Sequence, residues 1–566
     1  MRDSYFEEEL SYLHEAGKRF AQAYPDRASF LNLESVKDKD PTVERLLEGF
    51  AFLTSRIHQR LDDGVPEISE GLMQLLCPEF LRPLPSMCIM EFRPRKGMLQ
   101  NSYIINNGTE VLGVADTKSP VVCRFSLEQS VKVNPIAITK VSNTQSGSGT
   151  KLFIELQLDP GIQSGELDIS PLRFFLGGDL FRAIALRELL LEHMTGCSIR
   201  AGNSCVQLDP KEAIRSAGFD HYGEHHPFCL IRDYFAFPEK FLFLDFFGLD
   251  SKAVSDSNSS TLCIDILLDS MLPPKHSLSQ DHFKLHCVPA INIFRKDTEP
   301  VTVTGQMREY PLYTDISAPE SFHLYSITQV IGINNRTGAK TIYPPFTSFD
   351  GNSERFYTLR RSPDDKQRMY ISMGGRQLNE TELIEENLHI AAFQTNGDVP
   401  RMLLSENCIN KPSSGFPDYI SFANITRPTS PLHPCREAVL SWILISHLFG
   451  SITGVTDAEQ LRRMLDLYDW TEQKRGSQKT RAIQSLKLVP IQEIKANSIM
   501  RGIELHLEIE ESGFQGDGDL HFFGTLLLEC LGSMVSINTS FRLTIHLIPS
   551  GKCMRWQSRS GTRTML

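Results

Sequence analysis

In the first 80 residues, apolar side chains are spaced as in amphipathic helices. Apolar side chains recur every three or four positions over residues 6–24, and Pro25 ends the predicted helix. A second helix begins at Asp40-Pro41, because an N-cap residue followed by proline is a typical helix start. A third, shorter helix is predicted over about 66–77. The pattern therefore predicts an N-terminal helical segment, residues 1–90.

The second helix carries an apolar stripe that is close to a heptad seam and therefore needs a partner helix. The partner can be the first helix, through Leu10 and Leu13, or another protein chain, and the spacing fits both. The stripe consists of Val43, Leu46, Phe50, Leu53, Ile57 and Leu61.

The pattern changes after residue 86. Short apolar runs alternate with turns rich in Gly, Asn, Asp and Pro, which indicates β-rich domains over 91–250 and 251–430. Beyond residue 431, strand, helix and strand follow one another, and an apolar run over 438–452 indicates a buried helix. We predict an α+β multidomain protein: an N-terminal helical segment, two β-rich middle domains and a C-terminal mixed α/β domain over 431–566.

Composition narrows the classes of function. The chain has 58 basic and 69 acidic residues, a net charge of −11, which argues against a dedicated nucleic-acid binder. The acidic start lacks the apolar core of a secretory signal, and no apolar stretch has transmembrane length. The twelve cysteines are scattered and form no CxxC pair, which is typical of reduced core thiols. We expect a cytoplasmic protein without direct membrane insertion.

Candidate chemistry is sparse. The sequence lacks the loops and motifs that bind nucleotides or carry out hydrolysis. Adjacent acids such as Glu385-Glu386 point to opposite faces of a strand, so they do not by themselves form the paired carboxylates of a glycosidase. The best metal candidate is one segment without a second ligand pair, so an ordinary polar loop is the favoured interpretation. Its possible ligands are His221, His225, His226 and Cys229. His282 and His286 are expected to point outward from a strand.

The C-terminal run of bases is the last feature of this kind. Lys552, Arg555, Arg559 and Arg563 occur without intervening acids, so we expect a solvated tail, with a docking strip for an acidic partner as the alternative. We therefore predict no catalytic residue, no cofactor and no metal. A β-rich hydrolase and a metal-dependent binding module remain the alternatives to a structural role.

Several long segments, in the same order along the chain, resemble one bacterial family. The family is TssF, also called VasA or ImpG, a baseplate subunit of the type VI secretion system. The matching segments are residues 5–13, 40–53, 61–67, 76–87, 233–245, 287–294 and 442–448, with the region from 514 to 523.

The resemblance implies a non-enzymatic scaffold. Members of the family pair as two copies with one TssG, join TssK and TssE in a wedge, and assemble around the VgrG spike hub. The resulting baseplate docks on the inner-membrane complex from the cytoplasm and templates the tube and sheath. In this context we hypothesise that Phe50, Leu53 and Ile57 lie in a helical bundle with a second TssF copy and TssG.

Overall fold

The structure is a computed structural model of the 566-residue chain. Its backbone is described except at residues 1, 24–40, 63–65, 115–120, 148, 220–225, 258, 272–277, 305, 349–354, 362–367, 376–384, 435–437, 451, 475, 496–497 and 562–566. Side chains are in addition not described at 2–4, 43, 58–62, 66–70, 146, 166, 438–441, 448–449, 453, 494–495 and 498–499.

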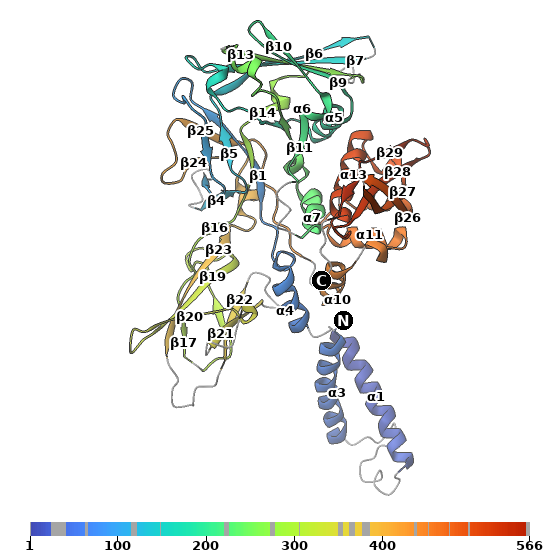
Figure 1. Ribbon diagram of the computed structural model, residues 1–566. Coiled ribbons are helices and arrows are strands. Elements are labelled where there is room, and N and C mark those ends of the chain that lie inside the picture. Colours follow the sequence, from blue (N-terminus) through green and yellow to red (C-terminus); the bar gives the residue numbers. More distant parts are fainter. Residues whose placement is uncertain are drawn as a thin grey trace. The chain divides into compact units, whose positions relative to one another are not determined.

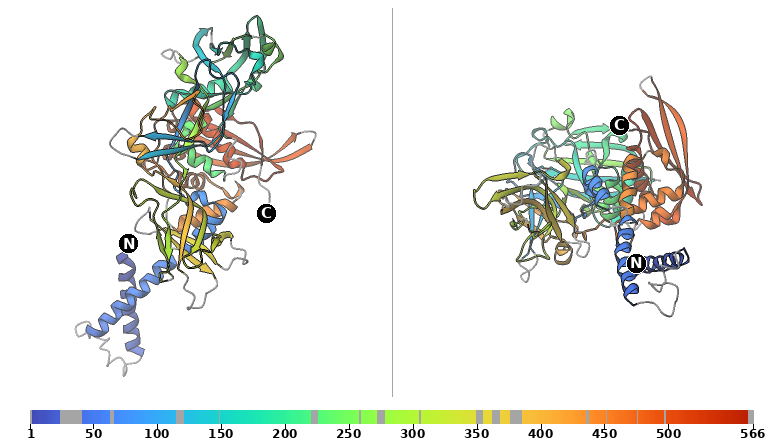
Figure 2. Two further views of the ribbon diagram at one scale, coloured as in Figure 1. Left: turned by 90° about the vertical axis from the view of Figure 1, so that its left-hand side faces the viewer. Right: turned by 90° about the horizontal axis from the view of Figure 1, so that it is seen from below.

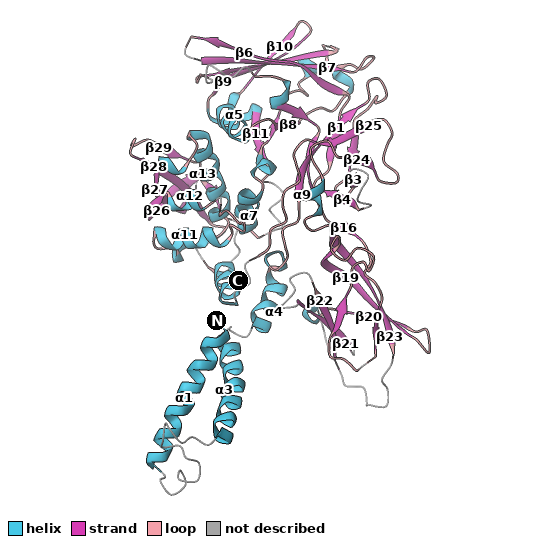
Figure 3. Ribbon diagram, turned by 180° about the vertical axis from the view of Figure 1, so that it is seen from behind, coloured by secondary structure: helices cyan, strands magenta, loops and turns pink. Residues whose placement is uncertain are grey.

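The chain forms two compact units. The first comprises residues 1–81 and 435–450, and the second comprises residues 82–434 and 451–566 (Figure 1). Helices build the first unit, whereas strands dominate the second (Figure 3). The predicted α+β multidomain class is confirmed. Strand β1 (Met87–Pro94) spans the predicted boundary near residue 90, and β7 (Gly149–Leu158) pairs with β13 (Thr261–Leu268) across the one near 250. The four-domain division stays a prediction.

The first unit contains two helix pairs. Helix α1 lies beside α3, with His14 Nε2 2.7 Å from Glu44 Oε1, and α4 lies beside α10. Helix α3 begins at Pro41, as its sequence predicts. The bounds are α1 (Arg2–Ala23), α3 (Pro41–Asp62), α4 (Pro66–Leu76), the 3₁₀ turn η1 (Pro78–Phe80) and α10 (Ala438–Phe449).

A six-stranded antiparallel sheet forms the centre of the second unit. Strand β1 lies in its interior, and Cys88, Ile89, Met90 and Phe92 are fully buried because both faces of this strand are covered. The strand order is β24 (Ile409–Pro412), β3 (Glu110–Val114), β4 (Val122–Leu127), β15 (Cys287–Ile291), β1 (Met87–Pro94) and β25 (Ile420–Asn424). A separate two-stranded sheet pairs β2 (Tyr103–Ile105) with β5 (Val131–Val133).

Two further sheets pack face to face, and α5 (Leu180–Glu192) packs with them. Apolar side chains from both sheets, among them Ile154, Ile264, Phe174 and Phe246, enclose a void of only about 10 Å³. One sheet orders β10 (Ser204–Leu208), β9 (Met194–Ala201), β13 (Thr261–Leu268), β7 (Gly149–Leu158) and β6 (Ile136–Ser146); the other orders β11 (Ile214–Ala217), β12 (Phe243–Phe246), β8 (Leu172–Leu176) and β14 (Phe283–Leu285).

Residues 294–395 form a region of two small sheets. Its two connections to the central sheet meet at Asn292 and Asn396, which are fully buried and exchange hydrogen bonds of 2.6 and 2.9 Å. One sheet comprises β16 (Phe294–Arg295), β23 (Glu386–Thr395), β19 (His323–Asn334), β20 (Lys340–Tyr343) and β17 (Val301–Val303); the other comprises β18 (Tyr310–Leu312), β22 (Met369–Gly375) and β21 (Arg355–Arg361).

The C-terminal part is the predicted strand–helix–strand unit. Strands β27 and β28 are parallel and α13 connects them, while β26 and β27 form a long hairpin (Figure 2). The bounds are α11 (Ala458–Leu467), α12 (Ser477–Arg481), β26 (Ile483–Lys495), β27 (Ser498–Glu510), α13 (Asp517–Gly532), β28 (Thr539–Ile548), β29 (Cys553–Arg555) and β30 (Arg559–Ser560).

Shorter helical segments occur throughout the second unit. They are η2 (Ser164–Glu166), α6 (Pro210–Ala213), η4 (Pro238–Phe241), α8 (Lys252–Ser255), η5 (Gln280–His282), η6 (Phe346–Ser348), α9 (Val399–Leu403), η8 (Ile452–Gly454) and η9 (Glu511–Gly513).

The basic C-terminal run is part of this fold and is not a free tail, although Lys552 and Arg555 are exposed to solvent as expected. Strands β29 and β30 pair with β28, and Arg559 forms an ion pair with Glu529. The Trp556 ring lies where a Cβ at position 524 would stand. The absence of a side chain at Gly524 therefore allows the C-terminal segment to pack on α13. Arg563 lies outside the described residues.

Helix α7 (Phe228–Ala236) is buried along its whole length. Its aromatic residues contact the C-terminal part: the Phe228 ring stacks on Tyr468 with a centroid distance of 4.4 Å, and Tyr234 meets Phe522 edge-on at 5.0 Å. Lys479 Nζ donates to the Tyr234 hydroxyl at 2.6 Å and to Asp519 Oδ1 at 2.5 Å. The helix therefore connects the β-sheets to the C-terminal part.

Buried charges surround the same helix. Asp233 accepts hydrogen bonds from Arg232 and from Lys240, and Lys240 Nζ also lies 3.0 Å from Glu128 Oε1. Arg232, Asp233 and Lys240 are each less than 10% exposed. Because the carboxylates compensate the buried cations, the chain can hold charge at this junction between elements that are distant in sequence.

His286 differs from its predicted outward orientation. It is 6% exposed and has a left-handed backbone with φ of 55°, between β14 and β15. Its Nε2 accepts a hydrogen bond from the backbone N–H of Asn134 at 3.1 Å. Burial lowers the pKa of His286 to about 4, against a smaller opposing effect of a backbone hydrogen bond with Phe92. A local break in the strand thus reverses the predicted orientation.

We expect His286 to make the protein less stable in mild acid. Because its pKa is lowered on folding, its contribution is complete above the unfolded pKa of about 6.5 and is lost as pH falls toward 4. The loss at pH 4 should reach about 3 kcal/mol. His286→Asn, which tolerates the left-handed backbone, should flatten urea-unfolding stability against pH over this range. An unchanged slope would contradict the assignment; exposed His389→Asn is the control.

We expect Asp233→Asn to destabilise the protein by about 3–5 kcal/mol, because it leaves buried cations without their carboxylate. The measurement is the free energy of unfolding in urea. Asp281→Asn is the matched control, since its side chain is 83% exposed beside Lys284 and should contribute at most about 1 kcal/mol. Equal effects of the two substitutions would show that the buried pairs do not hold the junction.

Candidate partner-binding surface

Small side chains form the contact between α1 and α3. Ala51 and Ser55 of α3 are 0% and 6% exposed, and Ala21 of α1 is 2% exposed. The Ser55 hydroxyl donates to the Phe52 carbonyl at 2.9 Å, so its polar group is satisfied within the helix. The first helix therefore covers the small-residue side of α3.

The predicted apolar stripe lies elsewhere on α3. Leu46, Phe50, Leu53 and Ile57 are 71%, 58%, 62% and 60% exposed. At about 100° per residue, these four positions lie about 150° around the helix from the small-residue side. The side chains of Val43 and Leu61 are outside the description. We call the four exposed residues the α3 stripe.

The α3 stripe is not packed on Leu10 and Leu13, which were the intrachain alternative. Both leucines are half-buried, while all four residues of the stripe are more than half exposed. Contiguous exposed apolar residues of this size mark interaction surfaces more often than solvated ones. The stripe is therefore available to another protein.

Sequence analysis missed a second apolar surface in the same unit. Met73 and Leu444 are buried between α4 and α10, but neighbouring large side chains remain exposed. The exposed residues are Leu72, Leu75 and Leu76 of α4 and Trp442 and Ile443 of α10. The expectation of a buried helix over 438–452 is therefore wrong at Trp442 and Ile443, while Leu444 is buried. The near-absence of polar residues around α10 was the available signal, since an all-apolar helix needs cover on every side.

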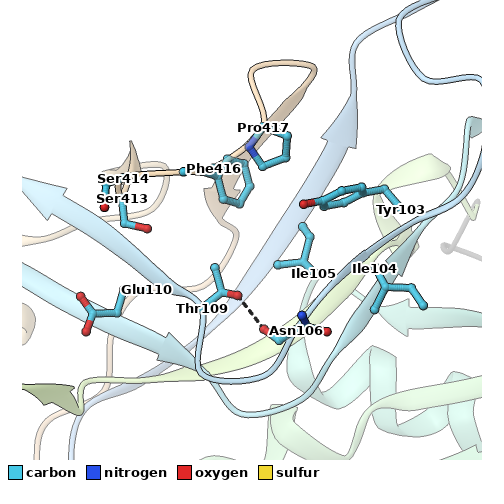
Figure 4. Close-up of a pocket in the computed structure, with 11 residues that line it drawn as sticks. Tyr103, Ile104, Ile105, Asn106, Thr109, Glu110, Ser413, Ser414, Phe416 and Pro417 are labelled. Carbon is cyan, nitrogen blue, oxygen red and sulfur yellow. Dashed lines mark hydrogen bonds between the residues drawn. The ribbon is translucent and has the colours of Figure 1, made fainter.

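A surface cleft of about 400 Å³ lies between β2 and the loop of residues 413–417 (Figure 4). Tyr103, Ile105 and Phe416 supply its apolar wall, and the Thr109 hydroxyl donates to the Asn106 carbonyl at 2.7 Å. Glu110 is the one acidic side chain among the lining residues. A histidine or second carboxylate is missing from this lining, so it holds neither a nucleophile–base pair nor an acid pair.

The predicted metal candidates are only partly described. His221 and His225 lie outside the described residues, Cys229 is buried in α7, and the His226 ring stacks on Phe228. Where the chain is described, no three His, Cys, Asp or Glu side chains are arranged to hold a metal ion. Of the acid pairs, Glu386 is buried and accepts a 2.6 Å hydrogen bond from Tyr343.

The described cysteines include several thiols that are poor nucleophiles. Burial raises the pKa of Cys77, Cys123 and Cys197 to about 12 in each case. At neutral pH these thiols remain protonated, and the thiolate is the reactive form. They fill the core, as the sequence predicts. Among the described residues, no helix has the length and apolar character needed to span a membrane.

A multi-sheet body combined with helices whose large apolar residues face outward defines a subunit of a protein assembly. Residues 2–563 match the family described as "Type VI secretion system, TssF". The chain belongs to this family, and the resemblance drawn from its sequence is confirmed.

Individual relatives agree with this assignment. The chain is 26% identical to the Type VI secretion system component TssF1 of Pseudomonas aeruginosa, with 99% of each chain covered. It also matches a chain in the structure of a type VI secretion system TssK-TssF-TssG baseplate subcomplex, with a TM-score of 0.76 and 26% identity over 92% of this chain and 99% of that one. A chain of a type VI baseplate complex, 24% identical over the full length of both, shares the fold with a TM-score of 0.60.

We expect substitutions on the two sides of α3 to affect the free chain differently. Ala51→Leu overfills the contact with α1 and should destabilise the helix pair by about 1–3 kcal/mol. Leu53→Ala removes an exposed side chain and should change stability by less than about 0.5 kcal/mol. Amide hydrogen exchange of α1 and α3 measures both. A large loss of protection from hydrogen exchange in Leu53→Ala would show instead that the stripe packs within the chain.

Proposed function

We propose that the chain is a non-enzymatic structural component of the type VI secretion baseplate wedge. In this role it assembles with TssG and TssK, and its α3 stripe enters a helical bundle with TssG and a second copy of the chain. The observation that carries the proposal is the exposure of Leu46, Phe50, Leu53 and Ile57, four large apolar residues on one side of a helix. The matched subcomplex, which contains TssK, TssF and TssG, supports these partners.

The finer proposal places two copies of the chain beside one TssG, with TssE in the same wedge and the VgrG spike hub at the centre. The wedges would then template assembly of the tube and sheath of a contractile injection machine. The site of action would be the cytoplasmic side of the inner-membrane complex. Permanent interfaces of this kind are large and apolar, and both apolar surfaces of the helical unit suit that role.

A purely structural role fits the chemistry of the described side chains. The cleft between β2 and residues 413–417 carries a single carboxylate, and buried thiols such as Cys123 are held protonated. The buried charged groups around α7 pair with one another instead of facing a cleft. A hydrolase or a metal-dependent module is therefore not favoured.

The test is co-expression with TssG and TssK from the same gene cluster, affinity capture through TssG, and mass determination of the captured complex. We expect a stable assembly that holds two copies of the chain for each TssG. A chain that remains monomeric beside soluble partners would contradict the proposal.

We further expect Leu53→Glu to abolish capture by TssG while the chain remains soluble. A carboxylate placed at the centre of a buried apolar interface should weaken binding at least ~30-fold, which corresponds to ~2 kcal/mol. Ser11→Glu adds the same charge at an exposed position of α1 and is the matched control. Wild-type capture of Leu53→Glu with normal hydrogen exchange would remove the stripe from the interface and leave the α4–α10 surface to be tested next.

A further inference from the structure

Two histidines meet on the solvent face of the C-terminal sheet. His506 lies on β27 and His546 lies on the neighbouring parallel strand β28. His506 is in register with Thr544, so His546 is its diagonal neighbour on the same face. The residues that alternate with them on these strands, including Leu505 and Ile545, are fully buried. The buried face fixes the register and thereby the position of both imidazoles.

The two rings present nitrogen atoms to each other. His506 Nδ1 lies 3.4 Å from His546 Nε2, and the rings are within 12° of parallel. Two imidazole nitrogens bound to one tetrahedral zinc ion, at about 2.0–2.1 Å each, stand roughly 3.3–3.4 Å apart. The separation is long for an N–H···N hydrogen bond but matches the span of a metal ion held between the rings.

A carboxylate stands behind one of the two rings. Glu504 Oε1 lies 3.7 Å from His506 Nε2, and the same oxygen accepts the Thr544 hydroxyl at 2.7 Å. Metal-binding histidines usually direct their second nitrogen at a carboxylate, which fixes the tautomer and raises the basicity of the ring. At 3.7 Å this contact is longer than a hydrogen bond, so Glu504 favours the proton on Nε2 through its charge, which leaves His506 Nδ1 as a lone-pair donor. The other oxygen of Glu504 lies 4.0 Å from Arg542 Nη1.

We propose that His506 and His546 form a two-histidine site for a late first-row transition metal such as Zn²⁺. No third His, Cys, Asp or Glu of the described residues completes the set. Both rings are partly exposed, so water fills the remaining positions on the metal. Imidazole ligands select zinc, nickel and copper over the harder magnesium and calcium ions. The proposal does not depend on the assembly role of the chain.

The probe is Zn²⁺ alone, titrated calorimetrically into the full-length chain. His506→Gln and His546→Gln should each remove one equivalent of bound zinc or weaken it at least tenfold. Glu504→Gln should weaken the same equivalent by about 10–100-fold while the histidines remain. His389→Gln, at an exposed position on β23, is the matched control and should bind as the parent does.

Thermal unfolding of each variant without metal confirms that a loss of binding is not a loss of fold. Zinc should raise the unfolding temperature of the parent and of His389→Gln but not of either site variant. The same zinc stoichiometry and affinity in all four variants would overturn the proposal. A loss in only one of the two histidine variants would also overturn it, because the metal would then not be shared by the pair.

Discussion

The compensated charge at α7 is the constraint on which the rest of the second unit depends. Arg232, Asp233 and Lys240 are buried where the sheets meet the C-terminal part, and Glu128 pairs with Lys240. Each ion loses its hydration, so the network is tolerable only when all its members are in place. The aromatic contacts of Phe228 and Tyr234 form around the same helix. Because α7 carries both the charge network and the aromatic contacts, we expect folding of the sheets and docking of the C-terminal part to be coupled.

The two units differ in how their apolar side chains are used. The sheets of the second unit bury large apolar side chains such as Phe174 and Phe246, which line a void of only about 10 Å³ next to α5. In the α1–α3 pair of the helical unit, by contrast, small residues such as Ala51 lie inside and large residues such as Phe50 lie outside. The chain thus combines a β-rich unit that has large apolar cores with a helical unit in which several large apolar residues lie exposed, as expected of a family member that functions inside a baseplate.

The sequence predicted the elements better than their environments. Helical spacing and proline positions located α3, and alternation located β27 and β28, because these signals are local. The burial of His286 was not predictable, since it results from one left-handed residue that a pattern of types does not encode. The basic C-terminal run was misjudged because its pairing with β28 is a tertiary contact. Spacing could identify the α3 stripe, but only the helix packing distinguished its exposed side from the buried one.

The small-residue contact between α1 and α3 affects how much unassembled subunit the cell retains. Alanine and serine bury little apolar area, so we expect the helix pair to open more readily in the unassembled chain than the large apolar cores of the second unit do. Cellular proteases cut segments that open and expose apolar residues. A copy made in excess of its partners would therefore be removed from its helical end, while an assembled copy would be protected, and turnover would match its abundance to that of the partners.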